Sequence, residues 1–296
     1  MSALVLQSGL ASATVLPESG ALVSQLTLVD RASKAQPILW LPEGFSTNDP
    51  NAWPGGGLPF LFPFAGRVWH GQEVLKYASG GQVYDMPLHG FSWSKPWTVS
   101  AKGPNSVKLT LKSDDESKKQ HYPFAFEIVM TITLSARTLH IAVDVVHTTL
   151  AAKTREKMPV ALGWHPYFKL AKKALATIPA DTSYAVTPVG NAGASDSVRD
   201  SLGPSPWTLP NPKLASLIFG DLNGEASRLD LGQYAVTISA GPEDVMQHVV
   251  TWTNRPEEFF CIEPWMSLPD AVARPTGCRW LKPGERVSAW LSLECH

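Results

Sequence analysis

A histidine and a glutamate, each set among aromatic residues, are the residues of this chain best suited to acid–base chemistry. His165 lies in the segment Gly163–Leu170 (GWHPYFKL), and Glu263 lies 98 residues later in Cys261–Trp265 (CIEPW). An imidazole can donate a proton while a carboxylate accepts another. Aromatic rings nearby could pack against the C–H face of a pyranose. The pair therefore suits proton transfer on a sugar.

Each of these residues also has a purely structural interpretation. A lone histidine between Trp and Pro is more often a satisfied core residue than a catalyst. Glu263 differs, because it follows the apolar run Phe259–Ile262, where a charged group is costly unless it is paired or used. Burial at that position would raise its pKa and make it a better base.

Two further segments place polar side chains beside glycine. Arg67 follows Gly66 at the end of an apolar run, where an arginine is either a structural ion-pair partner or a fixed set of donors for substrate hydroxyls. His89 precedes Gly90 in a predicted tight turn, and a histidine there often only caps the turn. The glycines Gly55–Gly57 lack the lysine and helix that a phosphate-binding loop requires, so phosphate binding there has little support.

Other catalytic motifs find little support in the sequence. The eight histidines are scattered, with neither H-E-x-x-H nor H-x-H, which gives a metal site little support. No G-x-S-x-G elbow occurs, and Ser92–Lys95 fits S-x-x-K without its partner motifs. A pair of acids for glycoside hydrolysis is conceivable, with Glu263 and either Asp270 or Asp144, but sequence alone does not give their separation.

The composition argues against several classes of partner. The net charge is −1 and charged residues make up 17% of the chain, so no basic field is available for nucleic acid or an anionic membrane. No apolar run reaches the roughly 18 residues of a membrane span, and Met1–Gly20 lacks the basic residues of a signal peptide. Cys261, Cys278 and Cys295 are expected to be reduced thiols. We therefore expect a cytoplasmic protein.

Alternation of apolar and polar residues is the clearest structural signal. It predicts a hairpin of two half-buried strands, Phe126–Leu134 and Leu139–Val145, joined through Ala136–Thr138. We expect further strands at Leu4–Leu6, Thr14–Leu16, Ala21–Val29, Val107–Leu111, Tyr234–Ala240, Val249–Thr253, Phe259–Ile262 and Val287–Leu293. Since no βαβ rhythm appears, we predict a mainly β protein, a single large antiparallel β-sandwich domain over residues 1–296.

Three segments depart from this strand pattern. Leu170–Ile178 is the one stretch that suggests two turns of helix. Lys112–Gln120 is densely charged and is predicted to be a solvated loop between strands. Gly190–Pro212 is rich in Gly, Ser, Asn and Pro, and is interpreted as a long surface excursion.

Taken in order, four segments resemble the aldose 1-epimerase (galactose mutarotase) family. They are Phe62–Val68 (FPFAGRV), Leu88–Phe91 (LHGF), Gly163–Leu170 and Cys261–Trp265. The resemblance implies a β-supersandwich fold of the galactose mutarotase type. It also implies an enzyme that interconverts the α and β anomers of free aldoses such as glucose or galactose, without a cofactor.

The resemblance also implies roles for individual residues. Glu263 matches the family's general base and His165 its general acid. His89 matches a second active-site histidine, and Arg67 matches the substrate-binding arginine. Asp221, in the segment IFGD, is the nearest candidate for the acidic residue that grips sugar hydroxyls.

Two departures from the family pattern bear on the substrate. Relatives that act on hexose 6-phosphates carry an arginine where this chain has Trp93, which disfavours a sugar phosphate. After E-P-W the chain continues with Met266 and Ser267 rather than Thr-Gly, so we expect a different sugar-facing rim. The alternatives are a non-catalytic carbohydrate-binding domain, a hexose-6-phosphate 1-epimerase and a glycosidase.

Overall fold

Strands dominate the computed structural model, which describes residues 3–46, 49, 52–149, 156–187, 190–195, 201–224, 226–274 and 277–296. Strands account for 51% of the residues and helices for 6%, which confirms the mainly β prediction. The named strand pairs in the described part are all antiparallel, as expected for a sandwich without βαβ units. None of the described helices has the length and apolarity needed to cross a membrane.

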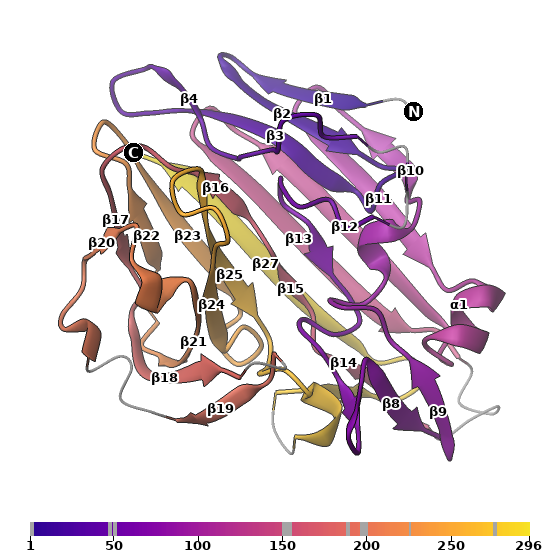
Figure 1. Ribbon diagram of the computed structural model, residues 1–296. Helices are drawn as coiled ribbons and strands as arrows, with labels where there is room; N and C mark the ends of the chain where they lie inside the picture. Colours follow the sequence, from indigo (N-terminus) through magenta and orange to yellow (C-terminus); the bar gives the residue numbers. More distant parts are fainter. Residues whose placement is uncertain are drawn as a thin grey trace.

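The largest sheet has nine strands, and its longest members run side by side in Figure 1. Apolar and polar residues alternate along these strands, so one face is buried and the other is partly wet. In spatial order the strands are β10 (Thr98–Lys102), β11 (Ser106–Lys112), β12 (Phe126–Leu134), β13 (Thr138–His147), β27 (Arg286–Cys295), β23 (Ala235–Gly241), β22 (Ser227–Asp230), β17 (Ala174–Thr177) and β20 (Trp207–Leu209).

A second sheet of eight strands carries the segments singled out by the sequence. In spatial order it contains β19 (Ala192–Ser195), β18 (Ala180–Val186), β21 (Ser216–Leu222), β24 (His248–Trp252), β25 (Phe259–Trp265), β15 (Gly163–Trp164) and β5 (Phe60–Leu61), and β16 (Tyr167–Lys169) also pairs with β25. β25 is therefore the strand at which β24, β15 and β16 meet.

Smaller sheets complete the fold. A four-stranded sheet, which contacts β12 and β27, consists of β1 (Leu4–Ser8), β2 (Ala11–Leu16), β3 (Leu22–Val29) and β4 (Ala35–Pro37). Three two-stranded sheets are β6 (Trp69–His70) with β7 (Glu73–Val74), β8 (Lys76–Ser79) with β9 (Gln82–Asp85), and β14 (Met158–Val160) with β26 (Arg279–Leu281).

The two faces of β25 pack against different partners. Phe260 and Ile262 join the main core, which they share with Ile128 of β12. Cys261 and Trp265 point the other way and belong to two small separate clusters. Because successive side chains of a strand alternate between faces, Glu263 lies on this second face, away from the main core.

The sequence predicted most strands, but not the structures of Leu170–Ile178, Lys112–Gln120 and Gly190–Pro212. The hairpin is confirmed, with Leu134 paired to Leu139 across the turn. Leu170–Ile178 is not helical, since β17 pairs there with β20 and β22, and sheet pairing outweighs helix propensity. Lys112–Gln120 is not only a loop, because α1 (Asp115–Gln120) forms there with Asp114 as its N-cap.

The segment Gly190–Pro212 is more regular than expected. Its described part contains β19 and β20, which extend the eight-stranded and the nine-stranded sheet respectively. Trp207 and Leu209 of β20 are buried, so this part of the segment belongs to the core and is not a surface excursion. Residues 196–200 of the segment lie outside the described part.

Candidate active site

The register of β25 places a histidine opposite the glutamate. β25 pairs with β15 at Trp265 and with β16 at Cys261. Counting inward from these two pairs brings His165, which lies between β15 and β16, opposite Glu263. Pro166 follows and lacks the N–H that a continuous ladder would need, which accounts for the break between the two short strands.

The two oxygens of Glu263 have different partners. Oε1 lies 3.3 Å from Nε2 of His165, and Oε2 accepts a hydrogen bond from the indole N–H of Trp265 at 3.2 Å. The indole thereby fixes the carboxyl group and leaves Oε1 facing the imidazole. Glu263 is 1% exposed and His165 is 5% exposed, so the contact between them is almost dry.

Burial drives both groups toward their neutral forms. It raises the pKa of Glu263 well above the usual range, and the hydrogen bond from Trp265 opposes this shift. Burial also lowers the pKa of His165 well below its usual range, with a further contribution from nearby His89. Since a lone charge is costly here, the pair is suited to hold one proton, carried by either partner.

His89 reaches the site from a tight turn. Its φ is +64°, a left-handed conformation that non-glycine residues seldom adopt. Its backbone N–H donates to the carbonyl of Gly66 at 3.0 Å, and the N–H of Gly66 donates to its Nδ1 at 3.1 Å. A Cβ on Gly90 would lie 2.0 Å from the carbonyl oxygen of Phe62, so only glycine fits there. The turn is thus anchored to the segment that ends in Arg67.

This anchoring also sets the protonation of His89. Because Nδ1 accepts from Gly66, the neutral ring carries its proton on Nε2. Burial, assisted by the Arg67 guanidinium, lowers the pKa of His89 to about 3. The ring stands perpendicular to that of His165, with centroids 5.3 Å apart. His89 is therefore a neutral hydrogen-bond donor beside the acid–base pair.

Arg67 is half-buried and passes close to Gly190, two residues before β19. A Cβ on Gly190 would lie 1.9 Å from Nη1 of Arg67, so glycine at that position makes room for the guanidinium. No carboxylate in the described part of the chain forms an ion pair with Arg67. The sequence allowed Arg67 to be either a structural ion-pair partner or a donor to substrate hydroxyls. The described residues thus offer no partner for the first of these roles.

Aromatic rings cover the two imidazoles. The ring of Trp53 stacks on His89 at 5.0 Å and meets His165 edge-on at 5.5 Å, while its N–H donates to the Tyr167 hydroxyl at 2.9 Å. Tyr167 in turn stacks on His165 at 4.7 Å. Tyr167 lies within a segment already singled out, whereas no pattern around Trp53 indicated that it covers the site.

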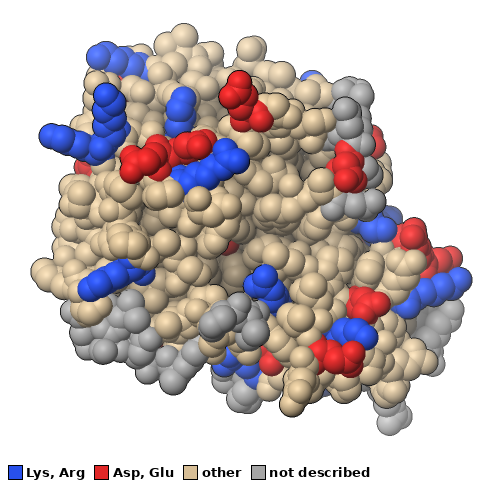
Figure 2. Space-filling model, in the orientation of Figure 1, with Lys and Arg blue, Asp and Glu red and all other residues tan. Residues whose placement is uncertain are grey.

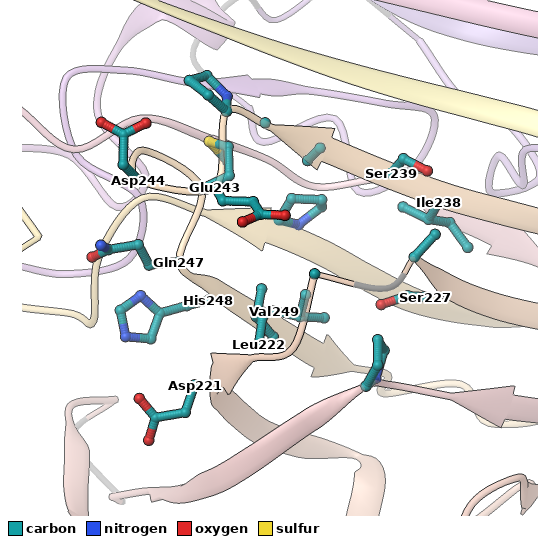
Figure 3. Close-up of a pocket in the computed structure, with 18 of the residues that line it drawn as sticks. Asp221, Leu222, Ser227, Ile238, Ser239, Glu243, Asp244, Gln247, His248 and Val249 are labelled. Carbon is teal, nitrogen blue, oxygen red and sulfur yellow. The ribbon is translucent and has the colours of Figure 1, made fainter.

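Asp221 lies at the end of β21 in a cavity of about 1100 Å³ (Figure 3). It is exposed and has a φ of +49°. Arg274 and His248 also line this cavity, whereas Arg67, His89, His165 and Glu263 do not. The structure therefore brings four of the five predicted site residues together and places Asp221 beside them in an adjoining part of the sheet.

His248 of β24 connects the cavity with the acid–base pair. It pairs with Trp265, and the next residue on its face, Val250, pairs with Glu263. His248 and Glu263 are therefore diagonal neighbours on the same face of the sheet. Such neighbours are about 7–8 Å apart, a distance that one sugar molecule can span. Asp221 lies next to His248 in Figure 3.

The position of His248 in the cavity lining beside Asp221 makes it a candidate ligand-binding residue. Burial lowers its pKa to about 4, opposed by a hydrogen bond to the Met266 backbone and by the charge of Asp221. Its Nδ1 is buried without a hydrogen-bond partner among the described residues. Sequence reasoning did not single out His248, since nothing beside it forms a motif.

The other acids considered from sequence accept hydrogen bonds of their own. Asp144 lies on β13 of the nine-stranded sheet, where it accepts a hydrogen bond from the Ser288 hydroxyl. Asp270 accepts a hydrogen bond from the backbone N–H of Trp69 at 3.0 Å.

The indole N–H of Trp93 donates to the Gly90 carbonyl at 2.8 Å, so this side chain is tied to the His89 turn.

Charge is sparse on the face shown in Figure 2, where acidic and basic side chains are scattered. With a net charge of −1, the described residues on that face form no basic field. A face without a strong field suits an uncharged ligand better than a polyanion.

Known proteins resemble this chain over nearly its whole length. The model of the aldose 1-epimerase family matches residues 2–294. An uncharacterised protein of Escherichia coli strain K12, YphB, is 28% identical over 253 residues, which cover 79% of this chain and 81% of YphB.

Solved structures share the fold at lower sequence identity. The Slr1438 protein of Synechocystis sp. PCC 6803 has a TM-score of 0.80 and 24% identity, covering 99% of this chain and 95% of that one. A galactose mutarotase-like protein of Lactobacillus casei ATCC 334 has a TM-score of 0.75 and 22% identity, with both chains covered completely. Galactose 1-epimerase of Lactobacillus acidophilus NCFM has a TM-score of 0.69 and 15% identity, covering 99% and 94%.

Proposed function

Because the chain belongs to the aldose 1-epimerase family, we propose that it interconverts the α and β anomers of free aldohexoses such as glucose or galactose. The observation that carries this proposal is the buried 3.3 Å contact between His165 Nε2 and Glu263 Oε1. Anomerisation removes a proton from one sugar oxygen and adds one to another, so it requires one base and one acid at the same ring.

In this mechanism Glu263 takes the proton from the C1 hydroxyl. His165 donates a proton to the ring oxygen O5 as the C1–O5 bond breaks. The open aldehyde rotates about the C1–C2 bond, and the two residues exchange roles when the ring closes on the other face. Each proton-transfer group typically contributes about 10²- to 10⁴-fold in rate.

The single proton of the pair supports this scheme. A pair that holds one proton has a carboxylate and an imidazolium in one of its two states, which is the state that starts ring opening. Removal of a proton from O1 and donation of a proton to O5 leaves a carboxylic acid and a neutral imidazole. That is the other state of the same pair, so the total proton count in the dry site does not change.

Three neighbours would bind the sugar. The Nε2–H of His89 and the guanidinium of Arg67 would hold O5 or adjacent hydroxyls and stabilise the charge that develops there. Asp221 would accept hydrogen bonds from hydroxyls farther from C1. His248 extends this set on the same sheet face, because it lines the same cavity as Asp221.

Polarimetry on freshly dissolved α-D-glucose and α-D-galactose tests the proposal directly. We expect the protein to accelerate the change in rotation and Glu263→Gln to lose about 10²- to 10⁴-fold in kcat. Asp144→Asn is the matched control, since it removes a carboxylate on the other sheet, and it should retain full activity. A panel with the corresponding 6-phosphates tests the hexose-6-phosphate alternative.

Two results would contradict the proposal. If Glu263→Gln equilibrates the anomers at the wild-type rate, Glu263 is not the base. If the wild-type protein binds the sugars in calorimetry but leaves their anomerisation at the uncatalysed rate, the carbohydrate-binding alternative holds instead. Release of reducing sugar from a glycoside would identify a glycosidase, and Asp270→Asn would then lose activity.

A further inference from the structure

Cys261 is a buried thiol for which the proposed proton transfer has no use. It lies two residues before Glu263 on β25 and therefore on the same face of the sheet. Its side chain is 0% exposed. The sulfur of Cys261, a ring nitrogen of His165 and a carboxylate oxygen of Glu263 all lie within 4.8 Å of one another. Within the described part of the chain, this is the one group of three potential metal ligands this close together.

We propose that His165, Cys261 and Glu263 form a binding site for Zn²⁺, and that zinc bound there inhibits the enzyme. The binding half of this proposal stands on the geometry alone. The inhibition half rests on the proposed function, because it assumes that the same histidine and glutamate transfer protons.

The distances fit a small tetrahedral ion. Zinc binds nitrogen and oxygen ligands at about 2.0–2.2 Å and thiolate sulfur at about 2.3 Å, which separates an N and an O ligand by about 3.4 Å in a tetrahedron. Nε2 of His165 and Oε1 of Glu263 are already 3.3 Å apart. The sulfur of Cys261 must come within about 3.6 Å of each, so each of its distances has to shorten by at most about 1.2 Å from the 4.8 Å limit of the cluster.

The charge of the three ligands also fits. A neutral imidazole, a thiolate and a carboxylate carry two negative charges together, and Zn²⁺ cancels them. The buried complex is then neutral, which avoids the cost of an unpaired charge in a dry site. The thiol proton and any proton on the carboxyl group leave to solvent when the metal binds. Sulfur, imidazole and carboxylate together are the ligand types that zinc takes in proteins.

Bound zinc would stop proton transfer by occupying the lone pairs that transfer protons. The Oε1 of Glu263 can no longer accept the proton of the C1 hydroxyl, and Nε2 of His165 can no longer carry one to O5. The three ligands leave a fourth position, which a water or a sugar hydroxyl can take without restoring the acid–base pair.

Metal binding is tested first with a readout other than activity. Full-length protein treated with a chelator and desalted is titrated with Co²⁺, a spectroscopic substitute for Zn²⁺, and with Zn²⁺ in competition. We expect about one ion per chain and a near-ultraviolet thiolate-to-cobalt charge-transfer band. Cys261→Ser should lose the band and weaken binding at least about tenfold, whereas Cys278→Ser, a half-buried cysteine in another cluster, should keep both.

The inhibition half is tested by polarimetry with the same proteins. Zn²⁺ should slow anomerisation by the wild type and by Cys278→Ser, and a chelator should restore the rate. Cys261→Ser should be active and at least about tenfold less sensitive to Zn²⁺. If circular dichroism shows that Cys261→Ser misfolds, Cys261→Ala takes its place.

No charge-transfer band in the wild type, or equal metal affinity in both serine variants, would overturn the site. A protein that gives the band but never anomerises sugars would refute the proposed function and leave the metal site standing.

Discussion

The nine-stranded and the eight-stranded sheet treat their side chains differently. Along β12 and β13 buried residues alternate with half-exposed ones, so each strand has a core face and a wet face. β25 of the eight-stranded sheet is buried at all seven positions. The first sheet can therefore place a charged residue in water. The second sheet buries Glu263, so a negative charge on it is costly unless a neighbouring group compensates it.

This difference shows where chemistry is possible in the fold. The long strands of the nine-stranded sheet provide a regular scaffold, while the candidate site uses the short strands β5, β15 and β16, whose breaks carry candidate side chains. His165 occupies such a break, and Arg67 and His89 follow from adjoining turns. Substitutions on the two sheets should therefore separate activity from stability.

Removal of the proposed acid should have the largest effect. We expect His165→Asn to lower kcat for anomerisation by about 10²- to 10⁴-fold, because asparagine cannot donate a proton to O5. His140→Asn makes the same change on the nine-stranded sheet, where His140 is exposed on β13, and should leave kcat unchanged. Equal activity of the two variants in polarimetry would rule out His165 as the acid.

A core substitution in the scaffold should affect stability instead. Leu291 of β27 is fully buried in the main core, so Leu291→Ala should lower the free energy of unfolding by about 2–5 kcal/mol through lost burial and a cavity. Urea denaturation measures this loss. Activity per folded molecule should stay at the wild-type level, and a large fall in kcat of the folded protein would show that the sheets are not separable.

Acid should destabilise the eight-stranded sheet through its neutral histidines. The pKa of His248 falls from 6.5 unfolded to about 4 folded, so between these values the unfolded chain binds more protons and stability is lost as the pH falls. At about 1.4 kcal/mol per pKa unit, the loss is on the order of 3 kcal/mol.

The raised pKa of Glu263 acts in the opposite sense, so the test compares two variants across the same pH range. Urea denaturation from pH 7 to pH 4 should show a shallower acid dependence for His248→Gln than for the wild type. The exposed His140→Gln should match the wild type. If the wild type and His248→Gln lose stability in parallel, His248 is not held neutral by burial.

The smallest effect is expected at the edge of the site. Asp221→Asn preserves the shape and tolerates the left-handed backbone at φ +49°, and it should raise KM for glucose or galactose by up to about tenfold with little change in kcat. Glu243→Gln alters another carboxylate of the same cavity and serves as the control. An unchanged KM for Asp221→Asn would remove Asp221 from the sugar site.

Much of the fold followed from patterns within single segments. Alternation identified the β12–β13 hairpin, because half-buried strands must show one face to water. The same logic failed for Leu170–Ile178, where Ala174 and Ala176 are buried in β17 but alanine also favours helices. α1 was missed because a densely charged segment suggested a solvated loop, although Asp114 is a good N-cap. The single-domain organisation over residues 1–296 stays a prediction.

Sequence by itself determined the family, the fold class and the candidate set Arg67, His89, His165 and Glu263, because motif residues and their order are written along the chain. Only the tertiary structure decided which atoms meet. The register of β25 sets His165 against Glu263, brings the Cys261 thiol to the same pair, and aligns His248 beyond it. These contacts join residues far apart in sequence, and strand pairing, which depends on the whole packed sheet, is what fixes them.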